Sequence, residues 1–357
     1  MPTVAEIADA VVGGDTHADT HTLQIALPSS VEIATATFPN TPAGLAAVVA
    51  WIVEHAPGPT VVVGLEGTRS YGIALERVLT AAGMPVAEVE RPSTKERRGR
   101  GKSDVLDARH AVLQVLAMDA DRLPTPRADG DREALRILLI ARRDLTTCKT
   151  AWANQLTALL RGGEDSDRQL LAKAGWSQAA LTTITRRRHS SGQSREQVVR
   201  RKEAQRLARA ILAADAELKT NKTQLTGIIN DLVPGLLDKV GVGPVSAAQA
   251  LVTYSHPGRV RSEAAYASLS GSSPVEASSG KTVRHRLNRG GDRALNRALH
   301  DIAVTRMRCD PRTRAYVERR RADGKSVREI RRLLKRYIAR ELYRTLNNNF
   351  RGALDNT

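Results

Sequence analysis

Four carboxylates occupy positions that suit a metal-dependent enzyme. Asp15 follows the apolar run VVGG and Glu66 follows TVVVGL, so each is expected at or near the carboxyl end of a strand. Asp104 and Asp107 are three residues apart in GKSDVLDAR, which puts both on one face at the start of a helix. Clustered acids raise one another's pKa, and a hard divalent cation removes that conflict. A set of oxygen ligands predicts Mg²⁺, with Mn²⁺ as the alternative.

Each carboxylate motif also has a plainer interpretation as a structural feature. An aspartate after a strand is commonly a turn former or a helix N-cap, and a glutamate near a strand end is commonly solvated. Acids at two strand ends and one helix start in a single α/β module nevertheless match the ribonuclease-H-like arrangement, in which a sheet and a helix bind metal together. We therefore interpret the four acids as one site.

Two neighbouring motifs are not expected to add to this site. The run GRGKS resembles part of a P-loop, but that loop requires a glycine where this chain has Glu96. His17 and His21 flank Asp15 in DTHADTH. Histidines four residues apart on an extended or turning segment do not converge, so we expect both to be solvated.

The charge of the chain is large and unevenly distributed. The 357 residues carry a formal net charge of +17. Residues 1–96 contain four Lys or Arg against eleven Asp or Glu, so they carry about −7 and the remainder about +24. An acidic module joined to basic ones indicates a phosphate backbone as partner, with a merely solubilising surface as the alternative. The length accommodates two or three domains with sizeable cores.

The composition also excludes several classes of protein. Two cysteines provide neither a disulfide framework nor a zinc site, which predicts a reducing compartment. No secretory segment and no apolar run of about eighteen residues is evident, so we expect a cytoplasmic, nucleoid-associated bacterial protein with no membrane partner. Aromatic residues make up only 3%, which argues against a platform for stacking single-stranded bases.

The N-terminal third predicts a mixed sheet flanked by helices, because three early strands are followed by strand–helix alternation. The expected strands are 10–15, 22–27, 31–38, 60–65 and 85–89, and the expected helices are 42–55, 71–82 and 103–118. Gly83 is a candidate C-cap and Ser103 a candidate N-cap. The cap at Ser103 places Asp104 and Asp107 at the positive end of the helix dipole.

The middle of the chain predicts two long helices. After a linker at 124–131, apolar residues repeat every seven positions in two stretches, which indicates an antiparallel hairpin or an oligomerising coiled coil. Arg142 and Lys149 interrupt the first repeat, and a polar insert at 162–195 separates the two. The first repeat is Leu138, Leu145, Trp152 and Leu159, with Leu135 and Leu156 beside it; the second is Ala204, Ile211, Leu218 and Leu225, with Leu207, Ala214 and Ile228.

The last third is expected to be helical and basic. LDKVGVGPVSAAQAL indicates a helix, a glycine turn able to present N–H groups to phosphate, and a second helix. A Ser/Gly-rich loop follows and contains Ser279. Its hydroxyl could attack a phosphodiester while nearby cations stabilise the developing charge, whereas the plainer interpretation is a flexible DNA-contacting loop. The expected nucleic-acid-binding residues are Lys281, Arg284, Arg286, Arg289, Arg293 and Arg297.

These motifs, in this order, resemble those of one family. GGDT (13–16), GLEGTRSYG (64–72) and KSDVLDAR (102–109) resemble the DEDD motifs of insertion-sequence transposases whose N-terminal domain is RuvC-like. The C-terminal runs VGVGPVSA, AYASLSGSSPVEASSGK and RGGDRALNRAL resemble the transposase domain of the same family. Its pattern of glycine, proline and a nucleophilic Ser-Gly corresponds to Gly271, Pro274, Ser279 and Gly280, with Ser278 as the alternative if the alignment slips by one residue.

The resemblance implies a fold and an activity. It implies a RuvC/ribonuclease-H-like catalytic domain at 1–123, a helical coiled-coil region at 132–230 and a mainly helical transposase domain at 235–347. It further implies a recombinase that excises and inserts a mobile element through a covalent phosphoserine, with Mg²⁺ held by the four acids. DNA, an element-encoded structured guide RNA and further copies of this chain, as a dimer or tetramer, are the implied partners.

Three other functions remain open from the residues alone. The first is a RuvC-like nuclease in which water attacks and Ser279 is incidental. The second is an actin-like or sugar-kinase ATPase, which lacks an evident second Gly-rich phosphate hairpin and explains the basic charge poorly. The third is a non-catalytic nucleic-acid scaffold, in which the acids have no role in activity.

Overall fold

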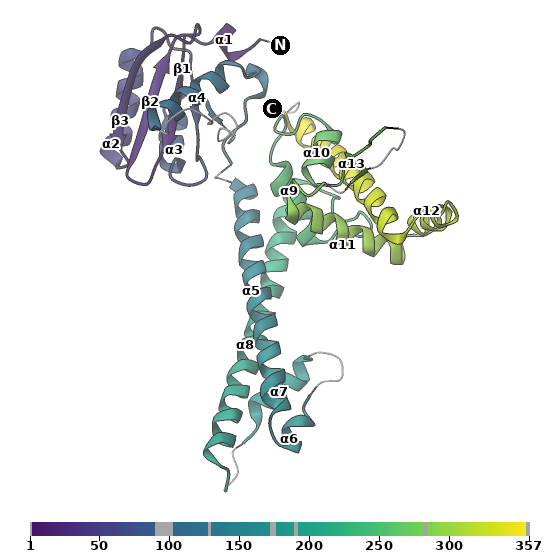
Figure 1. Ribbon diagram of the computed structural model, residues 1–357. Coiled ribbons are helices and arrows are strands. Elements are labelled where there is room, and N and C mark those ends of the chain that lie inside the picture. Colours follow the sequence, from purple (N-terminus) through teal and green to yellow (C-terminus); the bar gives the residue numbers. More distant parts are fainter. Residues whose placement is uncertain are drawn as a thin grey trace. The chain divides into compact units, whose positions relative to one another are not determined.

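The computed structural model describes residues 2–89, 103–127, 130–171, 176–188, 192–280, 285–286 and 288–354. The chain divides into two compact units. One comprises Met1–Glu133, Thr253–Arg293 and Arg332–Thr357, and the other comprises Ala134–Val252 and Ala294–Arg331. The predicted combination of an α/β region with long helices is confirmed (Figure 1).

A five-stranded mixed sheet organises the N-terminal region. The strand order is β3-β2-β1-β4-β5, with β1 antiparallel to β2 and parallel to β4. Each predicted strand forms within two residues of its expected bounds. The strands are β1 (Ala10–Thr16), β2 (Thr20–Ala26), β3 (Glu32–Pro39), β4 (Val61–Leu65) and β5 (Val86–Glu88).

Helices cover both faces of this sheet because residues along β1 alternate between two apolar layers. Val12 packs with α2 (Pro42–His55) and α3 (Ile73–Ala81), whereas Val11 packs with α4 (Asp104–Leu116) and α1 (Val4–Ile7). The three predicted helices form with nearly the expected bounds. Gly83 follows α3 with a φ of +80°, and Ser103 caps α4 by accepting from the Leu106 N–H at 3.3 Å. The 3-10 helix η1 (Ala120–Arg122) follows α4.

Two glycines allow α4 to lie directly on the sheet. A Cβ at Gly13 would stand 2.2 Å from the Ala108 carbonyl oxygen and 2.5 Å from the Val112 nitrogen, both backbone atoms of α4. A Cβ at Gly64, in the neighbouring strand, would stand 2.3 Å from a Val115 methyl group. The close approach therefore depends on the absence of a side chain at Gly13, and it fixes where the first turn of α4 stands.

The two heptad stretches form an antiparallel hairpin of α5 (Gly130–Arg161) and α8 (Arg195–Leu232) (Figure 1). The polar residues within it are paired across the hairpin. Arg142 donates to the Leu218 carbonyl at 2.9 Å, and Asn221, itself buried, donates to the Leu138 carbonyl at 2.9 Å. Lys149 forms an ion pair with Asp215. The interruptions of the heptad pattern are thus interhelical hydrogen bonds rather than packing faults.

The polar insert at 162–195 contains a helix whose apolar side chains are buried. It contains α6 (Asp165–Arg168) and α7 (Gln178–Arg186). Leu181 and Ile184 of α7 are buried in a core with residues of α5 and α8, and the Trp176 indole donates to the Ala153 carbonyl at 3.3 Å. The insert, which the sequence marked only as polar, therefore adds apolar residues to the core of the hairpin. Residues 172–175 and 189–191 lie outside the described residues.

The C-terminal third is helical, as expected, but its start differs from the prediction. Residues 236–240 form turns rather than a helix. The glycine turn packs on α11, because a Cβ at Gly241 would stand 3.0 Å from the Ile302 carbonyl and Arg306 donates to the Val240 carbonyl at 2.7 Å. The elements are α9 (Pro244–Tyr254), α10 (Glu263–Leu269), β6 (Val275–Glu276), β7 (His285–Arg286), α11 (Arg293–Cys309), α12 (Pro311–Ala322) and α13 (Val327–Leu354).

Candidate metal centre and serine loop

The ends of β1 and β4 bring two of the predicted acids to one edge of the sheet. Parallel pairing places Gly14 opposite Leu65, so Asp15 and Glu66 follow neighbouring positions. The Glu66 N–H donates to the Gly14 carbonyl at 3.1 Å, and Thr16 Oγ1 donates to the Glu66 carbonyl at 2.7 Å. Asp15 is only 5% exposed, whereas Glu66 is partly exposed. The two strand ends are therefore held together by hydrogen bonds of the backbone and of the Thr16 hydroxyl, which use neither carboxylate.

The first turn of α4 brings the other two acids to the same place. Burial raises the pKa of Asp15, and the charges of Glu66, Asp107 and Asp104 raise it further, against the opposing effect of His17. The geometry agrees, because Asp104 Oδ1 and Asp15 Oδ2 both lie within 3.4 Å of one nitrogen, and Asp107 stands in the same first turn of α4 as Asp104. The four carboxylates singled out in the sequence thus converge, and they come from two strand ends and one helix start.

His17 also belongs to this centre, which corrects the expectation of a solvated residue. Its Nε2 lies 3.1 Å from Asp15 Oδ2 and 3.4 Å from Asp104 Oδ1. His21 is fully buried, and burial lowers its pKa, so it is not solvated either. The signal for His17 was its spacing of two from Asp15, since residues i and i+2 of a strand point to the same face.

The donor set at this centre fits a divalent cation. Ligating atoms of Asp15, His17 and Asp104 all lie within 4.8 Å of one another, and two further carboxylates influence the same site. Several acids around a buried carboxylate are unfavourable without a compensating cation. Carboxylate oxygens and one imidazole nitrogen are ligands that hold such ions in proteins.

The serine loop lies between α10 and α11, and hydrogen bonds hold both of its ends in place. Ser272 Oγ donates to the Ala267 carbonyl at 3.0 Å, and the Asp292 N–H donates to the Leu269 carbonyl at 2.7 Å. Gly291 has a φ of +89°, and a Cβ there would stand 2.3 Å from the Leu269 oxygen. Sequence reasoning missed these anchors, although the paired glycines of RGGD indicated a special backbone conformation.

Ser279 stands near the tip of this loop and is exposed, as is Ser278. Gly280 follows with a φ of +57°, a conformation that favours glycine. Four of the predicted nucleic-acid-binding residues are described and all four are exposed: Arg286 in β7, Arg289 after it, and Arg293 and Arg297 in α11. Lys281 and Arg284 lie outside the residues whose side chains are described.

Both regions match known transposase sequences. Residues 12–163 match the transposase domain of DEDD type from the IS110 group, and residues 236–318 match the transposase family described as IS116/IS110/IS902. The chain belongs to the IS110 family of transposases. The first matched region contains Asp15, Glu66, Asp104 and Asp107, and the second contains Ser279.

A relative in Streptomyces coelicolor supports this assignment over part of the chain. It is described as an uncharacterized 43.6 kDa protein of insertion element IS110 and is 33% identical over 123 residues. The aligned segment covers 34% of this IS110-family chain and 30% of the relative. The chain therefore spans less than a third of the relative that it matches. Among the described residues, no helix has the length and hydropathy needed to cross a lipid bilayer.

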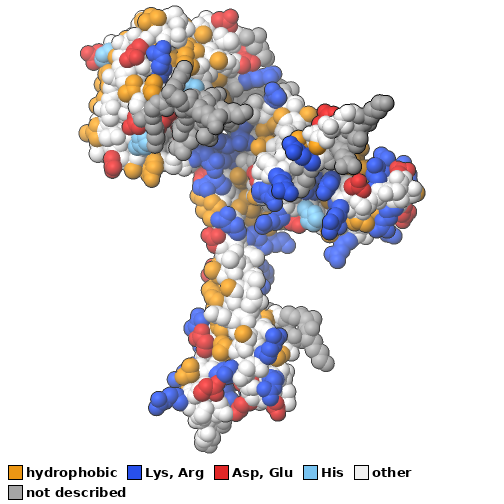
Figure 2. Space-filling view, viewed as in Figure 1, with side chains coloured by type: hydrophobic (Ala, Val, Ile, Leu, Met, Phe, Trp, Pro, Cys, Tyr) orange, Lys and Arg blue, Asp and Glu red, His pale blue; other side chains and the backbone are white. Residues whose placement is uncertain are grey.

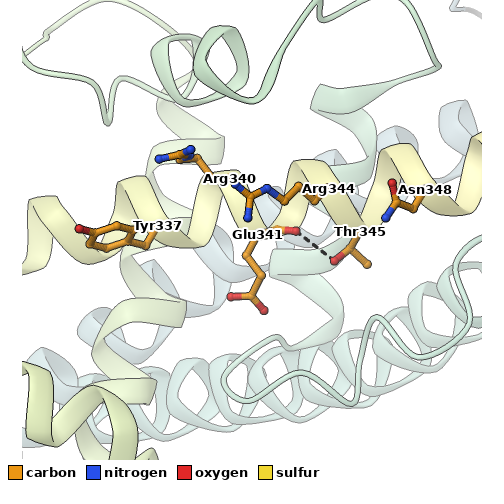
Figure 3. Close-up of a pocket in the computed structure, with 6 residues that line it drawn as sticks. All are labelled: Tyr337, Arg340, Glu341, Arg344, Thr345 and Asn348. Carbon is orange, nitrogen blue, oxygen red and sulfur yellow. Dashed lines mark hydrogen bonds between the residues drawn. The ribbon is translucent and has the colours of Figure 1, made fainter.

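Basic side chains gather over the C-terminal helices of this IS110-family chain (Figure 2). A cavity of about 450 Å³ lies along α13 and presents alternating charged and polar groups (Figure 3). Its two arginines, Arg340 and Arg344, both pair with Glu263 of α10 and hold the pKa of that carboxyl below its usual range. We therefore interpret the two arginines of this cavity as structural residues whose ion pairs with Glu263 join α13 to α10. The lining residues are Tyr337, Arg340, Glu341, Arg344, Thr345 and Asn348.

Asp15→Asn is expected to raise the melting temperature of the metal-free protein at pH 7. Because the pKa of Asp15 is raised in the folded state, that state holds the proton more tightly than the unfolded chain. Stability therefore falls as pH rises from the ordinary aspartate pKa through the raised one. The neutral amide of the variant escapes this loss, so its advantage should shrink at more acidic pH.

Thermal unfolding in EDTA at pH 7 and near pH 4 measures this effect. A metal titration completes the test, since a cation that binds only the folded state stabilises it by about 2.7 kcal/mol at a hundredfold excess over Kd. The wild type should show this gain and Asp15→Asn should show much less. Equal melting temperatures in EDTA at pH 7 would contradict the destabilising role of this carboxylate.

Proposed function

We propose that this chain is a DNA transposase that excises and inserts a mobile element through a covalent phosphoserine intermediate. The observation that carries the proposal is that Asp104, in the first turn of α4, reaches the buried Asp15 at the end of β1, where their ligating atoms and one of His17 lie within 4.8 Å of one another. This centre stands within one family-matched segment, and the exposed Ser279 stands within the other. A carboxylate centre together with a nucleophilic serine is what strand transfer through a covalent intermediate needs, whereas simple hydrolysis needs only the carboxylate centre.

The proposed reaction assigns a role to each group. Ser279 Oγ attacks the phosphorus and loses its proton, while the bond from phosphorus to a deoxyribose oxygen breaks and that oxygen leaves as a hydroxyl. The phosphoserine retains the bond energy, so a hydroxyl of another strand can later displace the serine. Nearby exposed cations, including Arg286 and Arg289, offset the charge on the reacting phosphate.

Asp15, Glu66, Asp104 and Asp107 would hold a divalent cation, Mg²⁺ or Mn²⁺. When bound, that cation supplies positive charge against the phosphate during strand cleavage. The acids themselves position it, because two are fixed by paired strands and two by a capped helix. The buried state of Asp15 excludes water from one side of the centre.

The partners are proposed from the same family membership. An element-encoded structured RNA would select DNA by base pairing, and the chain's many cations with few aromatic residues suit contacts to backbones rather than to bases. The long hairpin offers a surface for association into a dimer or tetramer. In such an assembly the carboxylates and the serine would come from different subunits.

A strand-cleavage assay with Asp104→Asn tests the proposed function. Wild-type protein should cleave element-junction DNA with a divalent cation and without ATP, and the variant should be slower by about 10²-fold or more. The control is Glu54→Gln, which changes an exposed acid on α2, across the sheet from α4. DNA binding without cleavage in both the wild type and Asp104→Asn would favour a scaffold, and unchanged cleavage in Asp104→Asn would contradict the role of the carboxylates. Dependence of cleavage on ATP would favour the kinase-like alternative.

A further inference from the structure

The imidazole of His17 stands at the carboxylate centre as a ligand would. A single atom, Nε2, faces two carboxylate oxygens that come from different elements, Asp15 Oδ2 at 3.1 Å and Asp104 Oδ1 at 3.4 Å. Without a cation, Nε2 makes a hydrogen bond with Asp15 Oδ2. With a cation bound between the two carboxylates, the same nitrogen would face that cation through its lone pair and add a third ligand from this side.

The separations agree with those of ligands around one ion. Metal–ligand bonds of about 2.0–2.3 Å give adjacent octahedral ligand atoms a separation of roughly 3 Å. Both separations measured from His17 Nε2 are close to that value, and the three ligating atoms lie within 4.8 Å of one another. The side chain therefore needs little movement to contribute a bond.

We propose that His17 is a direct ligand of the divalent cation at this centre and that it directs the site towards Mn²⁺ over Mg²⁺. The inference rests on the proposed metal role of the carboxylates and adds a residue outside the four acids. Imidazole nitrogen binds transition-metal ions better than it binds Mg²⁺, which prefers oxygen and retains its water. A set dominated by carboxylates but containing one nitrogen suits Mn²⁺ in particular.

Pulsed electron paramagnetic resonance of the full-length protein loaded with one equivalent of Mn²⁺ tests the inference without an activity measurement. The wild type should show electron spin echo modulation from a directly bound ¹⁴N nucleus, and labelling with [¹⁵N]histidine should change its frequency. His17→Ala should lose the modulation. His55→Ala is the matched control, because His55 ends α2, in the layer across the sheet from α4, and contacts the Trp51 carbonyl.

Affinity measurements provide the second readout. Loss of the ligand in His17→Ala should weaken Mn²⁺ binding by about 10- to 100-fold. Mg²⁺ binding, measured by displacement of Mn²⁺, should weaken much less, so the preference for Mn²⁺ should fall. His17→Gln serves as a second variant, since its amide keeps a polar side chain without a ring nitrogen.

The outcomes separate this inference from the proposed function. Mn²⁺ binding without nitrogen modulation in the wild type would overturn the role of His17 and leave the carboxylate centre intact. Modulation that persists in both His17 variants would overturn it equally. If Mn²⁺ binds with no greater affinity to wild type than to Asp104→Asn, the carboxylate centre itself fails, and the inference fails with it.

Discussion

Ser279→Ala is expected to abolish the covalent protein–DNA adduct while DNA binding persists. Removing a nucleophile in a reaction that depends on it lowers turnover by about 10⁴- to 10⁶-fold. The substitution removes one oxygen from an exposed loop tip, so the hydrogen bonds at the ends of the loop and the fold should be unaffected. The adduct is measured on a denaturing gel with end-labelled junction DNA, and binding is measured by a mobility shift.

Ser278→Ala is the control for this prediction, because Ser278 is adjacent and also exposed. It should retain the adduct, within a severalfold change in rate. If Ser278→Ala loses the adduct and Ser279→Ala keeps it, the nucleophile is the neighbouring residue. If both single variants and the double variant cleave DNA without any adduct, water is the nucleophile and the RuvC-like nuclease is the better description.

Gly13→Ala is expected to weaken both the fold and the metal centre. The added methyl group would stand 2.2 Å from the Ala108 carbonyl oxygen, and a backbone atom within a helix cannot move aside alone. Overpacking of this kind costs about 1–3 kcal/mol or more. The remaining response is a shift of α4 away from β1, which moves Asp104 and Asp107 away from Asp15. Catalytic geometry is sensitive to displacements of about 1 Å.

Gly227→Ala is the matched control, because it makes the same chemical change within α8, where a Cβ would meet nothing within 4 Å. It should stabilise the protein by up to about 1 kcal/mol, since alanine favours helix more than glycine does. Urea unfolding and Mn²⁺ affinity should both separate the two variants. A Gly13→Ala protein with unchanged stability and unchanged metal affinity would contradict the role assigned to this contact.

The carboxylate centre was largely accessible from the sequence because local rules determine it. A strand end fixes where Asp15 and Glu66 stand, and the N-cap at Ser103 fixes where the α4 acids begin. The strand and helix bounds followed for the same reason, since apolar runs and caps are local signals. The prediction for His17 was wrong because it considered only the spacing of four between His17 and His21. The spacing of two between Asp15 and His17, which places both side chains on the same face of a strand, was the informative one.

Other features depended on contacts that no local pattern contains. The burial of Leu181 and Ile184 requires α7 to fold back on the hairpin, which a polar flanking sequence does not predict. The use of Gly241 for packing on α11 likewise depends on a residue more than sixty positions away, Ile302. The hydrogen bonds that hold the ends of the serine loop also join residues that are not neighbours in the sequence, such as Asp292 and Leu269.

The polar pairs across the hairpin set an alignment that apolar packing would leave free. Two helices that pack only through leucines and alanines can shift by one turn at small cost. Here such a shift would leave Arg142, Asn221 and Lys149 without their partners. Helix α8 has 38 residues and thus extends about 57 Å. The polar pairs therefore fix the register of α5 against α8 over this length. A seven-residue insertion into only one of the two helices should shift these pairs out of register rather than lengthen the hairpin.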